Sequence, residues 1–275
     1  MRYLRIFALI ALVASLAFSI WANIQYNKGL NTDLPELTST VDVLEISVQD
    51  GPEAIFRGLA ARDDTDGDLT AQIMVASVSH FLEPNTVNVK YVVFDSHHNS
   101  ASLTRRVCYT DYTPPRFTMD KAPIYTVGKS FDLLEHVRVE DCIDGDISER
   151  IRVISNMVNN YAVCVYPVIL EASNSCGDTA QITIWVTYAA RENTADIKLH
   201  QYIVYIEEGE AFDPYKWIAS VTGPNTQPLD AEKIEIQGNL DTQTPGIYKL
   251  TYSYSDATCS GQSAITVVVT ERGAA

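Results

Sequence analysis

The pattern of apolar and polar positions changes after the first thirty residues of the chain. Residues 6–22 form an apolar run of 17 residues, interrupted only by Ser15 and Ser19. As a helix at ~1.5 Å per residue, this run reaches ~26 Å, near the lower limit for crossing a bilayer. We therefore expect a transmembrane signal-anchor helix over residues 6–24, preceded by a cytoplasmic stub of residues 1–5.

The residues that flank this run predict its orientation. Arg2 and Arg5 precede it, and positive flanks stay in the cytoplasm. We therefore expect a single-pass protein of the cell membrane whose C-terminal part is extracellular. A cleaved signal peptide, with secretion of the remainder, is the alternative. The anchor is preferred because residues 20–22 carry the bulky Trp21 where a cleavage site needs a small residue.

From about residue 40 the pattern becomes that of short strands. Runs rich in Val, Ile, Thr and Tyr alternate with turns that contain Pro, Gly, Asn and Asp. No later stretch sustains a 3.6-residue period over three helical turns. Many short strands separated by turns are typical of antiparallel sandwiches or barrels. Examples of such runs are residues 87–94, 161–170, 181–188, 202–206, 247–254 and 264–270.

The predicted strands fall into three repeats. Residues 61–73 and 139–151, offset by 78 positions, share an acidic residue, Asp-Gly-Asp, an aliphatic residue, a hydroxyl residue and a final Ile. Residues 229–234 form a weaker copy without Asp-Gly-Asp. Self-similarity at such a period indicates tandem modules. After a linker at 25–45, we place the three repeats at residues 46–113, 114–190 and 197–271.

A tyrosine lies downstream of each copy, and we align these tyrosines as equivalent positions. They are Tyr91, Tyr166 and Tyr252. Asp95 and Asp256 follow the first and third by four residues. Residues four apart share one face of a strand, so each pair is expected on a common face.

Together these motifs resemble a bacterial Ig-like repeat of the type found in surface proteins and in a pesticidal crystal protein, which is similar to hyalin-type repeats. The resemblance covers residues 46–271. It implies an all-β fold of tandem Ig-like β-sandwich domains on a cell surface, with adhesive, structural or spacer roles, and it implies no catalysis. The residues that carry it are Asp66-Gly67-Asp68-Leu69-Thr70, Asp144-Gly145-Asp146 and Pro245-Gly246-Ile247-Tyr248.

The charge balance narrows the classes of partner. The chain has 20 basic and 35 acidic residues, a net charge of −15, and all three residues with charge in the first 28 are basic. The part expected outside the cell is therefore more acidic than the whole. Such a chain is a poor partner for nucleic acid or an anionic membrane surface. We interpret the charge as a source of solubility, with affinity for divalent cations as the alternative.

The Asp-Gly-Asp turns are candidate cation sites. Glycine permits a positive φ, and flanking aspartates cap the turn by accepting backbone N–H groups, which requires no ligand. We prefer this structural role and expect no cofactor. The alternative is calcium, which takes six to eight oxygens, although the spacing lacks the EF-hand pattern. Its ligands would be Asp66, Asp68, Asp144 and Asp146.

The five cysteines form no C-x-x-C pair, which argues against a structural zinc site. Cys142 lies beside the second Asp-Gly-Asp turn and Cys176 in the late turn of the same repeat. If the repeat folds as the resemblance implies, both loops lie at one end of a sandwich, and we predict a Cys142–Cys176 disulfide. His97 and His98 are interpreted as part of a solvated turn, because adjacent residues seldom chelate one metal.

No catalytic motif is present: G-x-S-x-G and H-E-x-x-H do not occur. We therefore predict a non-catalytic, membrane-anchored bacterial surface protein that acts in adhesion, in protein interaction or as a structural spacer. Its partner outside the cell would be an unidentified protein or glycan. The alternatives are a calcium-rigidified, cadherin-like adhesion module and a carbohydrate-binding accessory protein.

Overall fold

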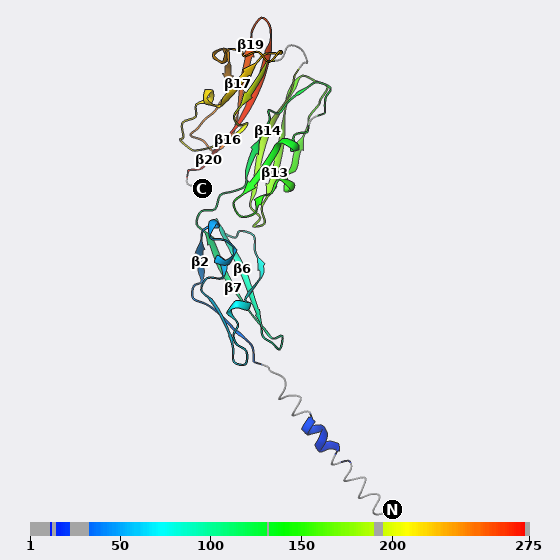
Figure 1. Ribbon diagram of the computed structural model, residues 1–275, viewed down its shortest axis with the longest axis vertical. Helices are drawn as coiled ribbons and strands as arrows, with labels where there is room; N and C mark the ends of the chain where they lie inside the picture. Colours follow the sequence, from blue (N-terminus) through cyan, green and yellow to red (C-terminus); the bar gives the residue numbers. More distant parts are fainter. Residues whose placement is uncertain (1–11, 13–14, 23–32, 131, 190–194, 273–275) are drawn as a thin grey trace, which may run out of the picture. The chain divides into compact units, whose positions relative to one another are not determined.

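The computed structural model describes residues 12, 15–22, 33–130, 132–189 and 195–272 (Figure 1). Residues 12 and 15–22 are helical. The rest of the expected transmembrane segment, the whole stub at 1–5 and the start of the linker lie outside the described residues. Within the described part of the chain, no helix is both long enough and apolar enough to cross a membrane.

The chain divides into two compact units. The first comprises residues 1–44, 52–78 and 88–107, and the second comprises residues 45–51, 79–87 and 108–275. Beyond the N-terminal helix, the described residues form strands joined by turns and single 3₁₀ turns. The 3₁₀ turns are η1 (Val48–Asp50), η2 (Pro52–Phe56), η3 (Thr70–Gln72), η4 (Leu134–His136), η5 (Ser148–Arg150), η6 (Pro214–Trp217) and η7 (Ala231–Lys233).

The described strands form six sheets, which follow one another along the chain in three pairs of one small and one four-stranded sheet. The first pair is β1 (Glu36–Ser39), β3 (Leu59–Asp63) and β4 (Gly67–Asp68), with β2 (Val43–Ile46), β7 (Ser100–Tyr109), β6 (Thr86–Phe94) and β5 (Met74–Val78). The second is β8 (Arg116–Met119), β10 (Val137–Asp141) and β11 (Gly145–Asp146), with β9 (Ile124–Thr126), β14 (Thr179–Ala189), β13 (Cys164–Ser173) and β12 (Arg152–Asn156). The third is β15 (Asp196–Leu199) and β17 (Ile218–Thr222), with β16 (Ile203–Glu207), β20 (Ser260–Thr270), β19 (Gly246–Ser255) and β18 (Glu235–Gln237). We call these pairs the first, second and third sandwich.

The four-stranded sheets share one strand order. In each, the last two long strands are neighbours at the centre, a short strand flanks one side and an early strand flanks the other. The orders are β2-β7-β6-β5, β9-β14-β13-β12 and β16-β20-β19-β18. The early strand pairs in parallel with the last strand in the second and third sandwiches. A β-bulge also recurs, at Val75–Ser77 of β5 and at Val153–Ser155 of β12, which are 78 residues apart.

Strict alternation places the apolar side chains of the strands in the core. In β3 and β10 every second residue is buried, ending in a buried aspartate, Asp63 or Asp141. Each fully buried aliphatic side chain stabilises the fold by about 1.5–3 kcal/mol relative to exposure. A slip of one residue would turn the apolar side chains toward solvent, which defines the register. The all-β prediction is confirmed.

The tyrosine alignment is out of register by four residues in the second sandwich. Leu170, not Tyr166, lies four positions before the late turn, as Tyr91 and Tyr252 do in the other two. All three of these side chains are completely buried, whereas Tyr166 is only half-buried. Residues four apart share a strand face, so the strand pattern alone did not distinguish the two registers.

Candidate functional site

Each Asp-Gly-Asp turn is built by an aspartate at the end of the preceding strand. The Asp63 Oδ1 atom accepts the backbone N–H groups of Thr65 and Asp66, at 2.8 and 2.9 Å. Asp141 makes the same two bonds at the end of β10. The central glycine has a φ of +78° in the first turn and +71° in the second, a conformation that disfavours other residues.

The second aspartate of each motif accepts the N–H of the first residue of the 3₁₀ turn that follows, across the N-cap position, where Leu69 or Ile147 makes no side-chain cap bond. Asp68 Oδ1 accepts the N–H of Thr70, and Asp146 Oδ1 accepts the N–H of Ser148, both at 2.9 Å. The side-chain and backbone hydrogen bonds from these hydroxyl residues hold the pKa of each carboxyl below its usual value. Two of the four residues considered for calcium therefore accept backbone N–H groups two positions later, a structural role that requires no ligand.

The first aspartate of each motif ties the turn to a later one. Asp66 Oδ2 accepts the N–H of Ser96, and Asp144 Oδ2 accepts the N–H of Ser175, both at 2.7 Å. Asp144 also pairs with the Arg150 guanidinium at 2.6 Å. Burial alone would raise the pKa of Asp144, but the bonds from Ser175 and Arg150 together lower it.

The late turns that follow β6 and β13 are organised by Asp95 and Asn174. Asp95 Oδ1 accepts the N–H groups of His97 and Asn99, at 2.9 and 2.7 Å. Asn174 Oδ1 accepts the N–H of Asp178, the residue equivalent to Asn99, at 2.9 Å. In the third sandwich Asp256 Oδ1 accepts the N–H groups of Thr258 and Cys259, at 2.7 and 2.9 Å.

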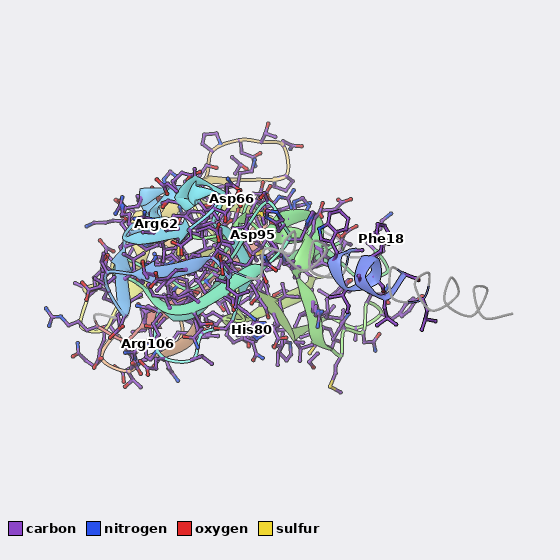
Figure 2. All side chains as sticks on the ribbon, turned by 90° about the horizontal axis from the view of Figure 1, so that it is seen from below. Phe18, Arg62, Asp66, His80, Asp95 and Arg106 are labelled. Carbon is purple, nitrogen blue, oxygen red and sulfur yellow. The ribbon has the colours of Figure 1, made fainter. Side chains whose placement is uncertain are left out.

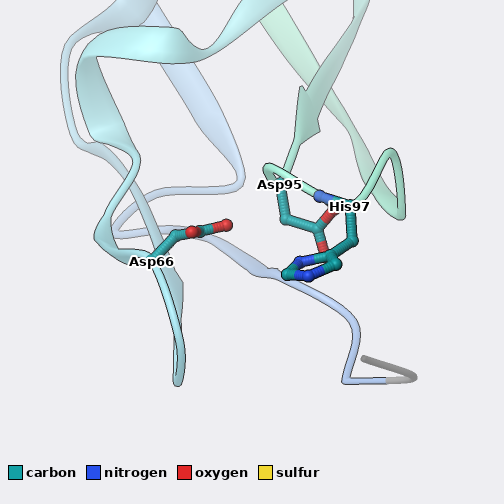
Figure 3. A group of neighbouring side chains, drawn as sticks. All are labelled: Asp66, Asp95 and His97. Atoms are coloured by element: carbon teal, nitrogen blue, oxygen red, sulfur yellow. Dashed lines mark hydrogen bonds between the residues drawn. The ribbon is translucent and has the colours of Figure 1, made fainter. Parts of the chain in front are cut away.

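Asp66, Asp95 and His97 form a group of possible metal ligands in the first sandwich. One ligand atom from each lies within 4.8 Å of the others. Asp95 is buried, Asp66 is half-buried and His97 is exposed. The Asp66 carboxylate points toward Asp95 and the His97 ring (Figure 3), and Figure 2 labels Asp66 and Asp95 among all the side chains.

Sequence reasoning missed two members of this group. The sequence favours a solvated turn for His97, and it distinguishes Asp95 only by its spacing from Tyr91. Asp68, Asp144 and Asp146 belong to no group of three potential ligands among the described residues, and calcium binding by them stays a prediction. The signal for Asp95 lies in the aligned late turns, where the second sandwich has an amide at the position of this carboxylate.

The two cysteines of the predicted disulfide are free thiols in the structure. The Cys142 thiol donates to the Thr113 carbonyl oxygen at 3.1 Å. Burial raises the pKa of the Cys176 thiol, and nearby carboxylates and the Cys142 thiol raise it further. The disulfide between Cys142 and Cys176 stays a prediction.

Residues 200–269 match the family model described as "Bacterial surface protein, Ig-like domain". The pesticidal crystal protein Cry22Aa of Bacillus thuringiensis is 30% identical over 129 residues, which are 44% of this chain and 17% of that relative. The chain thus spans less than a fifth of the length of Cry22Aa. The match at 200–269 shows a bacterial surface Ig-like domain in the third sandwich.

Two similar solved structures contain cadherin or carbohydrate-binding domains. The Drosophila N-cadherin EC1-3 structure shares 10% identity, covering 84% of this chain and 98% of that one, with a TM-score of 0.28. The M60 catalytic domain with CBM51-1 and CBM51-2 from Clostridium perfringens ZmpB shares 14% identity, covering 88% and 31%, with a TM-score of 0.26. At these scores neither likeness bears on function.

Proposed function

We propose that this chain is a non-catalytic bacterial surface protein that carries three tandem Ig-like domains, at residues 46–113, 114–190 and 197–271. The observation that carries the proposal is the strand order of the matched domain, β16-β20-β19-β18, which two earlier sheets of the chain repeat. The aspartate-capped late turn occurs in the same place in the first and third sandwiches. These common features support one module used three times.

The proposal includes export and anchoring by the N-terminal segment. The apolar run at residues 6–22 and the basic residues before it support a membrane anchor with the C-terminal part outside the cell. The acidity of the remaining chain supports an extracellular, highly soluble part that binds no nucleic acid.

An exposed apolar edge supports protein interaction as the role of the second sandwich. Strand β12 lies at the edge of its sheet, where unpaired backbone groups are available to a partner strand. Ile154 is 51% exposed, and Met157 and Tyr161, which follow β12, are each 80% exposed. Apolar side chains beside an open strand edge are typical of protein-binding surfaces.

Thiol labelling on intact cells tests export. Cys164 is exposed, whereas the other four cysteines are buried or half-buried. In a bacterium with a single membrane, we expect a membrane-impermeant maleimide to label the full chain at Cys164 without lysis. The Cys164→Ser variant is the control and should lose most of the label. Labelling that requires lysis would contradict a surface location.

Capture from a crosslinked cell surface tests the interaction role. The bait is residues 30–275, and Tyr161→Ser should reduce recovery of a specific partner. Tyr215→Ser is the matched control, because Tyr215 is also exposed, at 56%, but lies in the third sandwich. Equal recovery by both variants would exclude the β12 edge as the binding surface.

Carbohydrate binding is the second candidate function, and a groove in the second unit favours it. The groove has a volume of about 800 Å³, and the half-buried Tyr125 is among its lining residues, whereas Tyr202 and Tyr254, which also line it, are buried. Aromatic rings beside polar groups suit the apolar and hydroxyl faces of a sugar. Saturable binding on a glycan array that Tyr125→Ala abolishes would support this function, and no binding to any glycan would remove it.

A further inference from the structure

One buried carboxylate oxygen in the first sandwich lacks a hydrogen-bond partner. Asp63 is only 2% exposed. Its Oδ1 atom accepts two backbone N–H groups, but its Oδ2 atom has no partner among the residues that the structure describes. A buried, half-satisfied carboxylate is unfavourable, because the desolvation of the charge is only partly offset. An unpaired buried oxygen of this kind calls for a positively charged or proton-donating group.

The second sandwich shows which group faces this oxygen. Asp141, the counterpart of Asp63, receives a hydrogen bond on its Oδ2 atom from Asn174 Nδ2, at 3.1 Å. The counterpart of Asn174 is Asp95, because both open the late turn and both accept the N–H four residues later. Asp95 has no N–H to donate, and its Oδ2 atom accepts the Asn99 amide at 2.7 Å, so Asp63 has no equivalent of the bond that Asn174 gives Asp141.

Two more differences between equivalent positions of the two sandwiches also favour a cation in the first. The counterpart of Arg150, which pairs with Asp144 in the second sandwich, is the neutral Gln72. The counterpart of Cys176 is His97, whose imidazole lies with the carboxylates of Asp66 and Asp95 (Figure 3). The first sandwich therefore has one fewer counter-cation and one more metal-ligating ring than the second, and its late turn carries the carboxylate at the first position (Asp95) and not at the last, where the second sandwich has Asp178.

We propose that the first sandwich, and not the second, binds one divalent cation through the carboxylates of Asp66 and Asp95 and the imidazole of His97, with the buried charge of Asp63 facing this site as Asp141 faces Asn174. Calcium and magnesium take oxygen ligands, whereas imidazole suits transition metals and carboxylates suit Mn²⁺. The mixed set therefore favours Mn²⁺ or Zn²⁺ over Ca²⁺. This site differs from the calcium sets considered from the sequence, and it does not depend on the proposed surface function.

Titration of the full chain with Mn²⁺, followed by the electron paramagnetic resonance signal of the free ion, tests the proposal. Mn²⁺ is the probe because it binds thiolates poorly, so the cysteines do not interfere. We expect one saturable site. Asp95→Asn should weaken it by more than about tenfold, since loss of even a supporting group at a metal site typically costs ~10–100-fold.

The same variant has a second readout that does not involve metal. In Asp95→Asn the new amide supplies the donor that Asn174 supplies in the second sandwich, so the variant should fold and should resist urea better than the native chain without metal. Asp64→Asn is the matched control, because Asp64 is exposed in the same turn and the charge change is identical. It should leave Mn²⁺ binding unchanged.

His97→Ala distinguishes the metal classes. It should weaken Mn²⁺ and Zn²⁺ while leaving any weaker Ca²⁺ binding unaltered. Absence of a saturable Mn²⁺ site, or native-like Mn²⁺ affinity in Asp95→Asn, would overturn the proposal. Tighter binding of Ca²⁺ than of Mn²⁺, unaffected by His97→Ala, would overturn the assigned metal class.

Discussion

Replacing Asn174 by Asp is expected to destabilise the second sandwich strongly at neutral pH. Asn174 is 6% exposed, and its amide donates to the Tyr112 hydroxyl at 2.8 Å and to Asp141 Oδ2 at 3.1 Å. In the variant a carboxylate oxygen replaces this donor and faces the Asp141 carboxylate. The change removes two hydrogen bonds and creates a buried like-charge pair.

The magnitude of the destabilisation is set by the less costly of two alternatives, charge repulsion or protonation of one carboxyl group. Two unit charges at this separation repel by about 5 kcal/mol at an effective dielectric constant of ~20. Alternatively one carboxyl takes up a proton, which costs about 4 kcal/mol at pH 7 from an ordinary pKa of ~3.9. The second route is cheaper, so we expect a loss of about 4 kcal/mol in the free energy of unfolding at pH 7.

The loss should depend on pH with a defined sign. The pair has a raised pKa in the folded state, so the folded chain binds the extra proton, and the destabilisation grows as pH rises above the unfolded-state value. At pH 4.5 the protonation cost falls to about 1 kcal/mol. A loss that is the same at pH 4.5 and pH 7 would therefore refute the electrostatic explanation.

Hydrogen exchange of the amides in β13 and β14 measures this loss locally. Protection should fall by roughly a thousandfold at pH 7, which corresponds to the 4 kcal/mol. The control is Asn159→Asp, which adds the same charge at an exposed loop position. A fall smaller than about tenfold at pH 7, or an equal fall in the control, would show that the Asn174–Asp141 contact does not stabilise the fold.

Three further predictions concern other contacts. Tyr252→Phe removes the hydroxyl that donates to the Pro214 carbonyl oxygen at 2.8 Å, and it should cost about 0.5–1.5 kcal/mol in urea unfolding; no cost would contradict the bond's role. Hydrogen bonds from the Thr258 side chain and the backbone hold the pKa of Asp256 far below its usual value. The stabilisation of the fold by this carboxylate is therefore complete above about pH 4 and is lost only at lower pH. The stability difference between the native chain and Asp256→Asn should thus be constant from pH 5 to 8, and a change over that range in urea unfolding would contradict it. Mild oxidation should join Cys142 to Cys176 in a crosslinked peptide detectable by mass spectrometry and absent from Cys176→Ser; its absence from the oxidised native chain would exclude the disulfide.

Local chemistry made the strands and the aspartate turns predictable. Alternating apolar positions mark β3 and β10, and Asp-Gly-Asp requires only bonds between residues a few positions apart. The bonds that Asp68 and Asp146 accept from residues two positions later are of this local kind. The register of β13 was not predictable in the same way, because Tyr166 and Leu170 share a strand face.

The candidate metal group could not be found from local patterns. Asp66 and Asp95 are separated by 29 positions in the sequence. They become neighbours only in the folded chain, where the late turn after β6 lies beside the Asp-Gly-Asp turn. The orphaned oxygen of Asp63 is likewise a property of burial, which the sequence does not display. The sequence shows that the late turn begins with Asp95 in the first sandwich and with Asn174 in the second. The consequence of this difference depends on the hydrogen bond between Asn174 and Asp141, which only the structure shows.

Expression of residues 195–272 alone tests the modular account most directly. This segment contains the matched Ig-like domain, all strands of the third sandwich and its late turn. Its buried residues belong to one hydrophobic cluster that also includes residues of the second sandwich, so the experiment asks whether the segment's own share of that core is sufficient for folding. We predict β-type circular dichroism and a single cooperative thermal transition for this segment. A chain that stays unfolded, or that melts without cooperativity, would contradict the claim that the protein is built from repeated Ig-like modules.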